Sequence, residues 1–172
     1  VFAWPPNQET GWKYRQSTGQ AFYMFENIHI DSETAFGDGV NPSTADTTGV
    51  NYSAYCILDS IDCDVVGVFI SRNELEFAFD FNDDNEITSD EIGQLDLNDD
   101  GEITSSAEIC LGWTYADTSG FTTVPIMGRD SGQNYALEGY AQDGDIPYLK
   151  IYDASNDVIL PVEISNIYYE EN

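Results

Sequence analysis

Short apolar segments separated by polar turns recur along most of this chain. The segments are rich in Val, Ile, Tyr, Phe and Trp, which favour strands, and Gly, Asp and Asn cluster between them. Strands are predicted at residues 11–17, 20–31, 65–70, 108–115, 122–127, 135–141, 148–153, 158–161 and 164–169. Short strands at this spacing are typical of an antiparallel β-sandwich, so we expect a mainly β fold.

Two acidic twelve-residue segments interrupt the strand pattern, DFNDDNEITSDE at 80–91 and DLNDDGEITSSA at 96–107. Each places an oxygen side chain at positions one, three and five, a backbone carbonyl at seven and Ile at eight, as twelve-residue calcium loops do. The predicted ligands of the first loop are Asp80, Asn82, Asp84, the Glu86 carbonyl and Glu91. Those of the second loop are Asp96, Asn98, Asp100 and the Glu102 carbonyl.

The two loops deviate from the ideal pattern at different positions. The second has Gly101 at position six, the sharp turn, but Ala107 at position twelve, so its closing carboxylate must come from elsewhere, with Glu108 as the candidate. The first keeps Glu91 at position twelve but carries Asn85 at the turn, a residue that tolerates a left-handed backbone. We therefore expect two calcium ions, one in each loop.

The acidic pair resembles the calcium loops of EF-hand and dockerin proteins. The loop starts, Asp80 and Asp96, are 16 residues apart, which leaves room for one short helical turn at 89–95 and excludes two complete helix–loop–helix units. A compact, static calcium clip is therefore expected rather than a sensor that opens. The alternative is a solvated acidic loop without metal, because Asp, Asn and Gly also dominate ordinary turns.

Composition narrows the setting of the protein. The 172 residues include 32 Asp and Glu against 5 Lys and Arg, giving a formal net charge of −27. Nucleic acid and anionic membranes should be repelled, and such an acidic protein suits calcium-bearing, extracellular or cell-surface surroundings. No run is long enough for a transmembrane helix, and the start at Val1 is expected to be that of a mature secreted form.

The length suits one domain with an insertion. We expect an N-terminal arm at 1–12 and a β-sandwich at 13–172, with 72–107 as its calcium-binding insertion. Of three cysteines, Cys56 and Cys63 are the preferred disulfide across a short segment, with Cys63 to Cys110 as the competitor. No C-x-x-C spacing or neighbouring histidine accompanies them, so redox catalysis and zinc are not expected.

A further resemblance concerns the strands. The segments QSTGQAFYMFENIHID, DVVGVFI, EICLGW, VPIMGRD and EGYAQDGDIPYLKIYDAS, taken in order, resemble an immunoglobulin-like β-sandwich module of secreted and cell-surface proteins from marine and environmental bacteria. The resemblance spans about residues 14–160 and implies a sandwich of immunoglobulin-like or jelly-roll type. Such modules are building blocks of surface proteins, and no catalytic signature accompanies these motifs.

The sequence does not predict an enzyme. Its one histidine, His29, lies in a predicted strand, where a surface or structural role is expected. Paired carboxylates could serve a glycosidase, but a chain this acidic offers too many pairs for any one to be informative. Phosphate-binding, nucleophile-elbow and metalloprotease motifs are not found.

The N-terminal arm suggests a role in assembly. Its start, Val1, Phe2, Ala3 and Trp4, is apolar, ends at two prolines and has no hairpin partner in the sequence. Such an arm could add a strand to the sheet of a neighbouring copy, with Phe2 and Trp4 filling pockets. We therefore expect a homo-oligomer or polymer, a surface filament or layer, although the arm could equally pack on its own domain.

Two glycan-related expectations remain. The alternative function is a calcium-dependent carbohydrate-binding module. Its candidate stacking residues are Trp12, Trp113, Tyr115, Tyr168 and Tyr169, most of which are more simply core or interface residues. The chain could also be a glycoprotein, because Asn51 begins an N-x-S sequon and Ser43, Thr44, Thr47 and Thr48 form a hydroxyl-rich segment.

Overall fold

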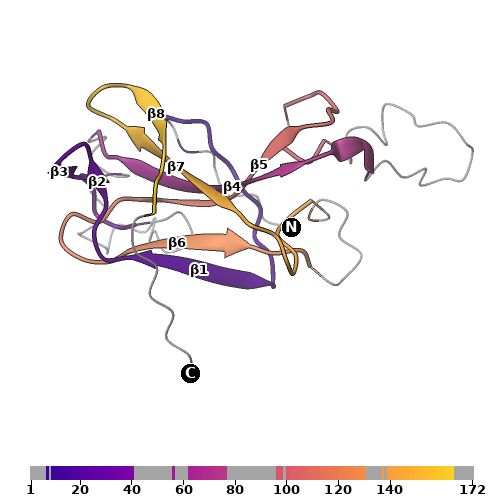
Figure 1. Ribbon diagram of the computed structural model, residues 1–172, viewed down its shortest axis with the longest axis horizontal. Coiled ribbons are helices and arrows are strands. Elements are labelled where there is room, and N and C mark those ends of the chain that lie inside the picture. Colours follow the sequence, from indigo (N-terminus) through magenta and orange to yellow (C-terminus); the bar gives the residue numbers. More distant parts are fainter. Residues whose placement is uncertain are drawn as a thin grey trace, which may run out of the picture.

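A computed structural model shows a mainly β protein with antiparallel sheets (Figure 1). It describes residues 7, 9–40, 56, 62–76, 96–98, 100–130, 137 and 139–164. Within these ranges a four-stranded sheet has the order β5-β4-β7-β8, and two pairs, β1-β6 and β2-β3, complete the strands. The only multi-residue helical element in this part of the chain is one 3-10 turn, η1 (Glu74–Glu76).

The four-stranded sheet is built around β4 (Val65–Arg72), which pairs with β5 (Ala107–Tyr115) on one side and β7 (Tyr148–Asp153) on the other. β4 begins with six consecutive buried residues, because both faces of a central strand are covered. β7 instead alternates, with Leu149, Ile151 and Asp153 buried and the residues between them more exposed. β8 (Val158–Pro161) forms the outer edge against β7.

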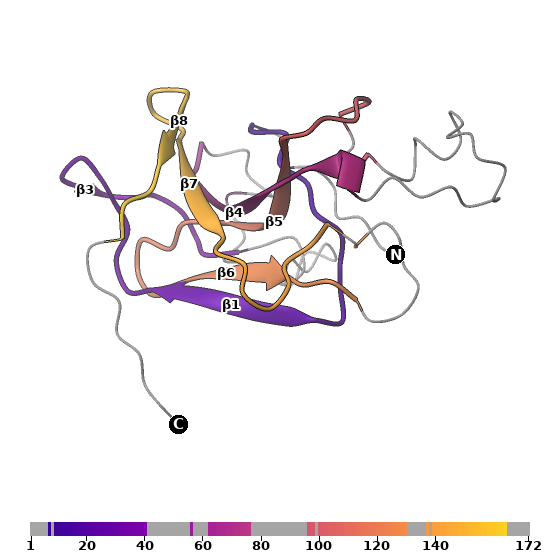
Figure 2. The same ribbon diagram turned by 45° about the vertical axis from the view of Figure 1, so that its right-hand side comes forward.

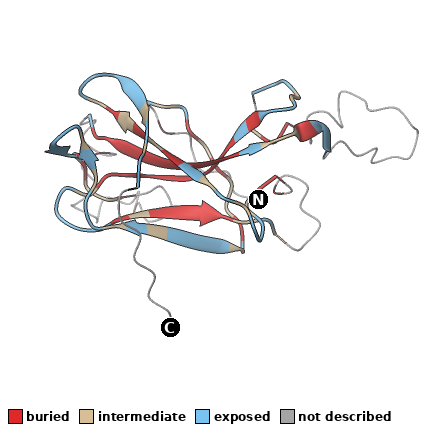
Figure 3. Ribbon diagram, viewed as in Figure 1, coloured by how far each residue is buried: buried red, intermediate tan, exposed pale blue. Residues whose placement is uncertain are grey.

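The pair β1 (Gln20–Phe25) and β6 (Thr122–Met127) forms a second layer beneath the larger sheet (Figures 1 and 2). The layers approach closely at Gly112 in β5, where an added Cβ would lie 1.9 Å from the Pro125 carbonyl oxygen. The strands β4, β5 and β6 are largely buried, whereas β1 is largely exposed (Figure 3). The remaining pair is a small hairpin of β2 (His29–Ile30) and β3 (Glu33–Thr34).

Several predicted strands are confirmed: 122–127, 148–153 and 158–161 have the bounds of β6, β7 and β8, and 65–70 and 108–115 fall within β4 and β5. The prediction of a strand at 11–17 is wrong. Trp12 and Tyr14 are buried as a strand would place them, but the segment forms no strand and only Arg15 makes an isolated bridge. The predicted strand at 20–31 is divided between β1 and β2, and the described part of 135–141 forms no strand, although Ala141 makes an isolated bridge to Gly128.

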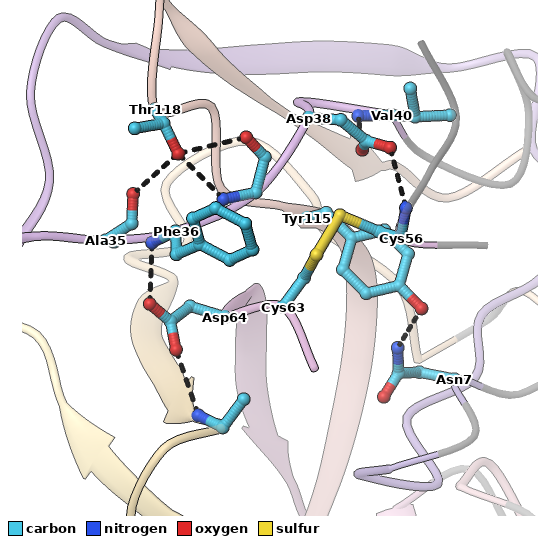
Figure 4. The surroundings of a disulfide bond; sticks show 12 residues. Asn7, Ala35, Phe36, Asp38, Val40, Cys56, Cys63, Asp64, Tyr115 and Thr118 are labelled. Carbon is cyan, nitrogen blue, oxygen red and sulfur yellow. Dashed lines mark hydrogen bonds between the residues drawn. A yellow bond between two sulfur atoms is a disulfide. The ribbon is translucent and has the colours of Figure 1, made fainter. Parts of the chain in front are cut away.

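The disulfide joins Cys56 to Cys63, the pairing preferred from the sequence, and Cys110 is a buried free thiol (Figure 4). Burial raises the pKa of the Cys110 thiol to about 12, so it stays protonated at neutral pH. Asp64 follows Cys63 and accepts backbone hydrogen bonds from Phe36 (2.7 Å) and Ala154 (2.9 Å). The disulfide and Asp64 thus hold the loop after β3 against the large sheet.

Candidate functional site

The second acidic loop lies between η1 and β5, in the segment that connects the neighbouring strands β4 and β5. The Asp96 carboxylate, 9% exposed, accepts hydrogen bonds from the backbone N–H of Asp100 (3.0 Å) and of Gly101 (2.7 Å). Gly101 has φ +89°, a conformation that L side chains rarely adopt. The first and sixth positions therefore have the roles that the loop pattern assigns to them, an inward-facing carboxylate and a glycine turn.

Asn98 and Asp100 complete the described part of this arrangement. The Asn98 amide donates to Asp100 Oδ2 (2.9 Å), and the Glu102 N–H donates to Asp100 Oδ1 (2.8 Å). The Asp100 N–H also lies 3.2 Å from Asn98 Oδ1. The Asp96 side chain thus turns towards the loop's own backbone, whereas Asp100 accepts the Glu102 N–H and the Asn98 amide at an exposed position.

The loop is tied to the sheet by Glu74, a residue that the sequence analysis did not identify. Its side chain is fully buried, and its two carboxylate oxygens accept the N–H groups of Leu97 (2.8 Å) and Thr104 (2.7 Å). The Glu74 N–H in turn donates to the Thr104 carbonyl (3.0 Å). Two acidic residues, Glu74 and Glu76, lie between the apolar strand and the acidic loops, and nothing in the spacing of Glu74 distinguishes it from the other carboxylates.

Glu108, the predicted closing ligand, has other partners. Its carboxylate accepts hydrogen bonds from the Tyr148 hydroxyl and from Lys150 Nζ, both at 2.6 Å, on the surface of the large sheet. Burial and then the hydrogen bond to Glu108 raise the pKa of the Tyr148 hydroxyl. Glu108 is thus held by β7 and lines one cavity together with Asn98, but the described residues contain no group of three or more His, Cys, Asp or Glu that joins it to Asp96 and Asp100.

The chemistry of the second loop suits a hard divalent cation. Calcium prefers carboxylate, amide and carbonyl oxygens, which Asp96, Asn98, Asp100 and the Glu102 carbonyl offer. The described residues contain no group of three or more His, Cys, Asp or Glu placed to hold an ion. In this loop only Asp96 and Asp100 are carboxylates of the predicted set, and the buried Glu74 carboxylate is occupied by the backbone amides of Leu97 and Thr104.

Several predicted residues lie outside the described ranges. They are the first loop with Asp80, Asn82, Asp84, Glu86 and Glu91, the helical turn at 89–95, the arm residues Val1, Phe2, Ala3 and Trp4, the sequon at Asn51, and Tyr168 and Tyr169. Of the other stacking candidates, Trp113 and Tyr115 are 3% and 4% exposed and Trp12 is 9% exposed, so all three belong to the buried core. His29 is exposed in β2.

No family model matches the chain, and comparison with curated proteins and with solved structures finds no match either. In the described part of the chain, no helix has the length and hydropathy needed to cross a membrane.

Proposed function

We propose that this protein is an extracellular, calcium-stabilised structural subunit or adhesive module, built as an immunoglobulin-like β-sandwich. The observation that carries the proposal is the second loop. In that loop the Asp96 carboxylate accepts hydrogen bonds from the backbone N–H groups of Asp100 and Gly101, and Gly101 has a left-handed backbone. The loop is one of two copies of the same acidic pattern. This is the local geometry that a twelve-residue calcium loop needs.

A bound cation would act on the centre of the fold. The insertion connects β4 to β5, the strands with the most extensive buried surface, and Glu74 already couples the second loop to the end of β4. The chain also carries a formal charge of −27, whose self-repulsion opposes a compact state. Calcium in the two loops would neutralise part of that charge where acidic residues are most concentrated.

Calcium binding is tested by calorimetric titration of the full chain, together with melting curves in calcium and in EDTA. We expect a stabilisation of about 3 kcal/mol at a hundredfold excess over Kd. Asp96→Asn and Asp100→Asn should weaken binding in the second loop, and Asp80→Asn should weaken it in the first. Asp143→Asn, which removes the same charge from an exposed turn, is the matched control. Identical melting curves in calcium and EDTA would contradict the proposal.

Self-assembly by strand addition is the second part of the proposal. Within the described residues, β1 pairs only with β6 and β8 only with β7, so each has an edge available to another strand. β1 exposes Phe22 (53%) and Met24 (65%) on one face, and β8 exposes Val158 (39%) and Ile159 (45%). An arm that brings Phe2 and Trp4 would complement such an apolar edge.

Assembly is tested by sedimentation and electron microscopy over a range of protein concentrations. The intact chain should form concentration-dependent polymers, whereas a chain lacking residues 1–6 should remain monomeric with an unchanged melting temperature. Trp4→Ala should lengthen the lag before polymers form. A chain that remains monomeric at every concentration, with and without calcium, would contradict this part of the proposal while leaving calcium binding intact.

A glycan-binding role is the alternative, and one observation favours it. A cavity of ≈ 160 Å³ lies beside the second loop and is lined by both Trp12 and Asn98. Aromatic and amide side chains in one hollow are the combination that sugar rings require, since the ring contacts an apolar surface and its hydroxyls need polar partners.

A further inference from the structure

The outer edge of β8 is poorly suited to accept another strand. Along an antiparallel strand, successive residues direct their backbone groups alternately to the partner strand and to the opposite side. The Val162 N–H donates to the Leu149 carbonyl of β7 (3.1 Å), so the preceding residue, Pro161, faces the outer edge. Proline has no N–H to offer there, and Glu163 adds an exposed charge just beyond it. Both features protect a sheet edge against pairing.

The outer edge of β1 has the opposite character. The Gly128 N–H donates to the Gly19 carbonyl (2.7 Å), which extends the pairing of β1 with β6 by one residue. By the same alternation, Gln20, Phe22 and Met24 direct their N–H and C=O groups away from β6. None of the three is a proline or carries a charge, and in the described part of the chain β1 has no strand on that side. We call the outward backbone groups of these three residues the β1 edge.

The side chains along β1 favour an apolar, uncharged partner. Tyr23 and Phe25 pack against the core, whereas Phe22 and Met24 point to the other face and are 53% and 65% exposed. Residues 16–25 contain no charged side chain, in a chain with a formal net charge of −27. The side chains of residues 1–6, VFAWPP, are also uncharged and mostly apolar. These two segments can therefore meet without the like-charge repulsion that acts elsewhere on this protein.

The N-terminal arm leaves the domain at Asn7, which is firmly held. Asn7 is 2% exposed, and its N–H donates to the Trp12 carbonyl (2.8 Å). Its side-chain amide lies 3.4 Å from the Tyr115 hydroxyl of β5 (Figure 4). The position of Asn7 therefore determines where the arm of each copy begins.

The arm begins on the face of the large sheet that points away from β1. Trp12 lies against Gly67 of β4, where an added Cβ would be 2.8 Å from its ring. Gly67 pairs with Trp113 of β5, so these two positions share a face of the sheet. The next residue of β5, Gly112, faces β6 instead, because successive residues of a strand point to opposite faces. Trp12 and Asn7 thus lie on one side of the large sheet, and the layer of β1 and β6 lies on the other (Figure 2).

This placement prevents the arm from pairing with its own β1. Trp4 is three residues before Asn7, so their Cα atoms are at most about 11 Å apart. Stacked β layers are themselves about 10 Å apart, and Asn7 stands above the far face of the upper layer. Trp4 consequently falls short of the β1 edge of its own chain, whereas it can reach the β1 edge of another copy stacked against it.

We propose that the β1 edge accepts residues 1–4 of another copy, so that the copies join head to tail. Phe2 and Trp4, two residues apart on an added strand, would cover Phe22 and Met24. Because arm and β1 edge lie on opposite faces of the protein, the same contact repeats from each copy to the next. The inference rests on the strand addition of the proposed function and adds its acceptor and its direction.

The acceptor is tested with two matched variants of the full chain, Met24→Lys on β1 and Ile159→Lys on β8. Each replaces an exposed apolar side chain by the same charge, so both should keep the melting temperature of the unaltered chain. Met24→Lys should raise the concentration at which polymers form by at least about tenfold, and Ile159→Lys should leave it unchanged. Sedimentation and electron microscopy in calcium-containing buffer measure both. Should Met24→Lys fail to fold, Phe22→Lys replaces it.

The direction is tested by mixing. Trp4→Lys disables the arm and leaves the β1 edge intact, whereas Met24→Lys disables the edge and leaves the arm intact. Each variant alone should remain monomeric. A 1:1 mixture contains one working arm for each working edge, so it should form heterodimers of one chain of each kind, and no polymers. Native mass spectrometry identifies the composition of these dimers.

The outcomes separate this inference from the proposed function. Polymers that form equally well from Met24→Lys would overturn β1 as the acceptor and leave strand addition standing. Unaltered chains that stop at dimers would overturn the head-to-tail order, because reciprocal exchange closes after two copies. A mixture that remains monomeric would also overturn the inference. Unaltered chains that remain monomeric at every concentration would overturn both the inference and the assembly on which it rests.

Discussion

The carboxylate of Glu74 accepts two backbone hydrogen bonds inside the protein, one from each end of the described second loop. A buried carboxylate is stable only when hydrogen-bond donors replace the water it has lost, and here Leu97 and Thr104 provide them. Glu74 thereby fixes the loop to β4 by hydrogen bonds that need no metal. The loop geometry and any affinity for calcium consequently depend on a residue outside the acidic repeat.

Substitution of Glu74 should lower the free energy of unfolding more than substitution of an exposed acidic residue in this chain. Glu74→Ala leaves two buried N–H groups without an acceptor, for an expected loss of roughly 2–5 kcal/mol in the free energy of unfolding. Glu74→Gln retains one acceptor oxygen and should lose about half as much. Denaturant unfolding measures both, with the exposed Glu76→Gln as the control. Equal stability of the Glu74 and Glu76 variants would contradict this role.

Asp145 gives a pH dependence with a defined sign. Its hydrogen bonds from Arg72 hold its pKa below the ordinary value of 3.8. The stabilisation is therefore complete above pH 3.8 and is lost as the pH falls through the lowered pKa. Asp145→Asn should be less stable than the unaltered chain at pH 7, and the difference in melting temperature should shrink progressively as the pH falls below 3.8. A constant difference across the acid range would contradict the assignment.

The pKa of Asp38 is shifted in the opposite direction to that of Asp145, so its effect on stability has the opposite pH dependence. Burial raises its pKa, although the N–H groups of Cys56 and Val40 donate to its carboxylate (Figure 4). Its ionised form is therefore disfavoured in the folded chain, and its protonation adds stability as the pH falls. Because Asp38 is present in both Asp145→Asn and the unaltered chain, its contribution to stability cancels when the two are compared.

At the scale of elements, the close approach of the two layers depends on Gly112. Because an added Cβ would lie 1.9 Å from the Pro125 carbonyl oxygen, Gly112→Ala must push β5 away from β6. We expect a loss of about 1–3 kcal/mol, measured by thermal and denaturant unfolding. Gly101→Ala is the comparison: nothing lies within 4 Å of its added Cβ, so its cost comes from the backbone at φ +89° alone. It should also weaken calcium binding, whereas Gly112→Ala should not.

The strands could be predicted from the sequence where the residues that form a buried pattern also pair with a neighbouring strand. The alternation in β7 and the apolar run in β4 follow directly from covering one or two faces of a sheet. The segment 11–17 alternates in the same way, and Trp12 and Tyr14 are buried, yet within the described residues it forms no strand and only Arg15 makes an isolated bridge. Periodicity reports which side chains avoid water, whereas pairing depends on distant chain segments that a single sequence does not specify.

The candidate sites were predictable to a similar extent. Asp96, Asn98, Asp100 and Gly101 follow from a local pattern in which each position has a fixed role. Glu74 and the partners of Glu108 depend on contacts across 23 to 42 residues, and the cavity requires that Lys13 and Arg15 meet Phe69 and Asn98 in space. These contacts arise only from the packing of the whole chain.

The whole molecule carries a charge large enough to set its response to salt. With 32 acidic and 5 basic residues, repulsion acts between most pairs of charges on the surface. The screening length falls from about 10 Å at 0.1 M salt to about 3 Å at 1 M, so added NaCl weakens this repulsion without occupying a specific site. In EDTA, the melting temperature should therefore rise by about 5 °C or more between low salt and 1 M NaCl, equivalent to roughly 1–2 kcal/mol. In saturating calcium the rise should be smaller, because bound ions have already neutralised the most crowded carboxylates. If the two salt responses have the same slope, calcium acts only as general ionic strength, and the proposed loops do not bind it specifically.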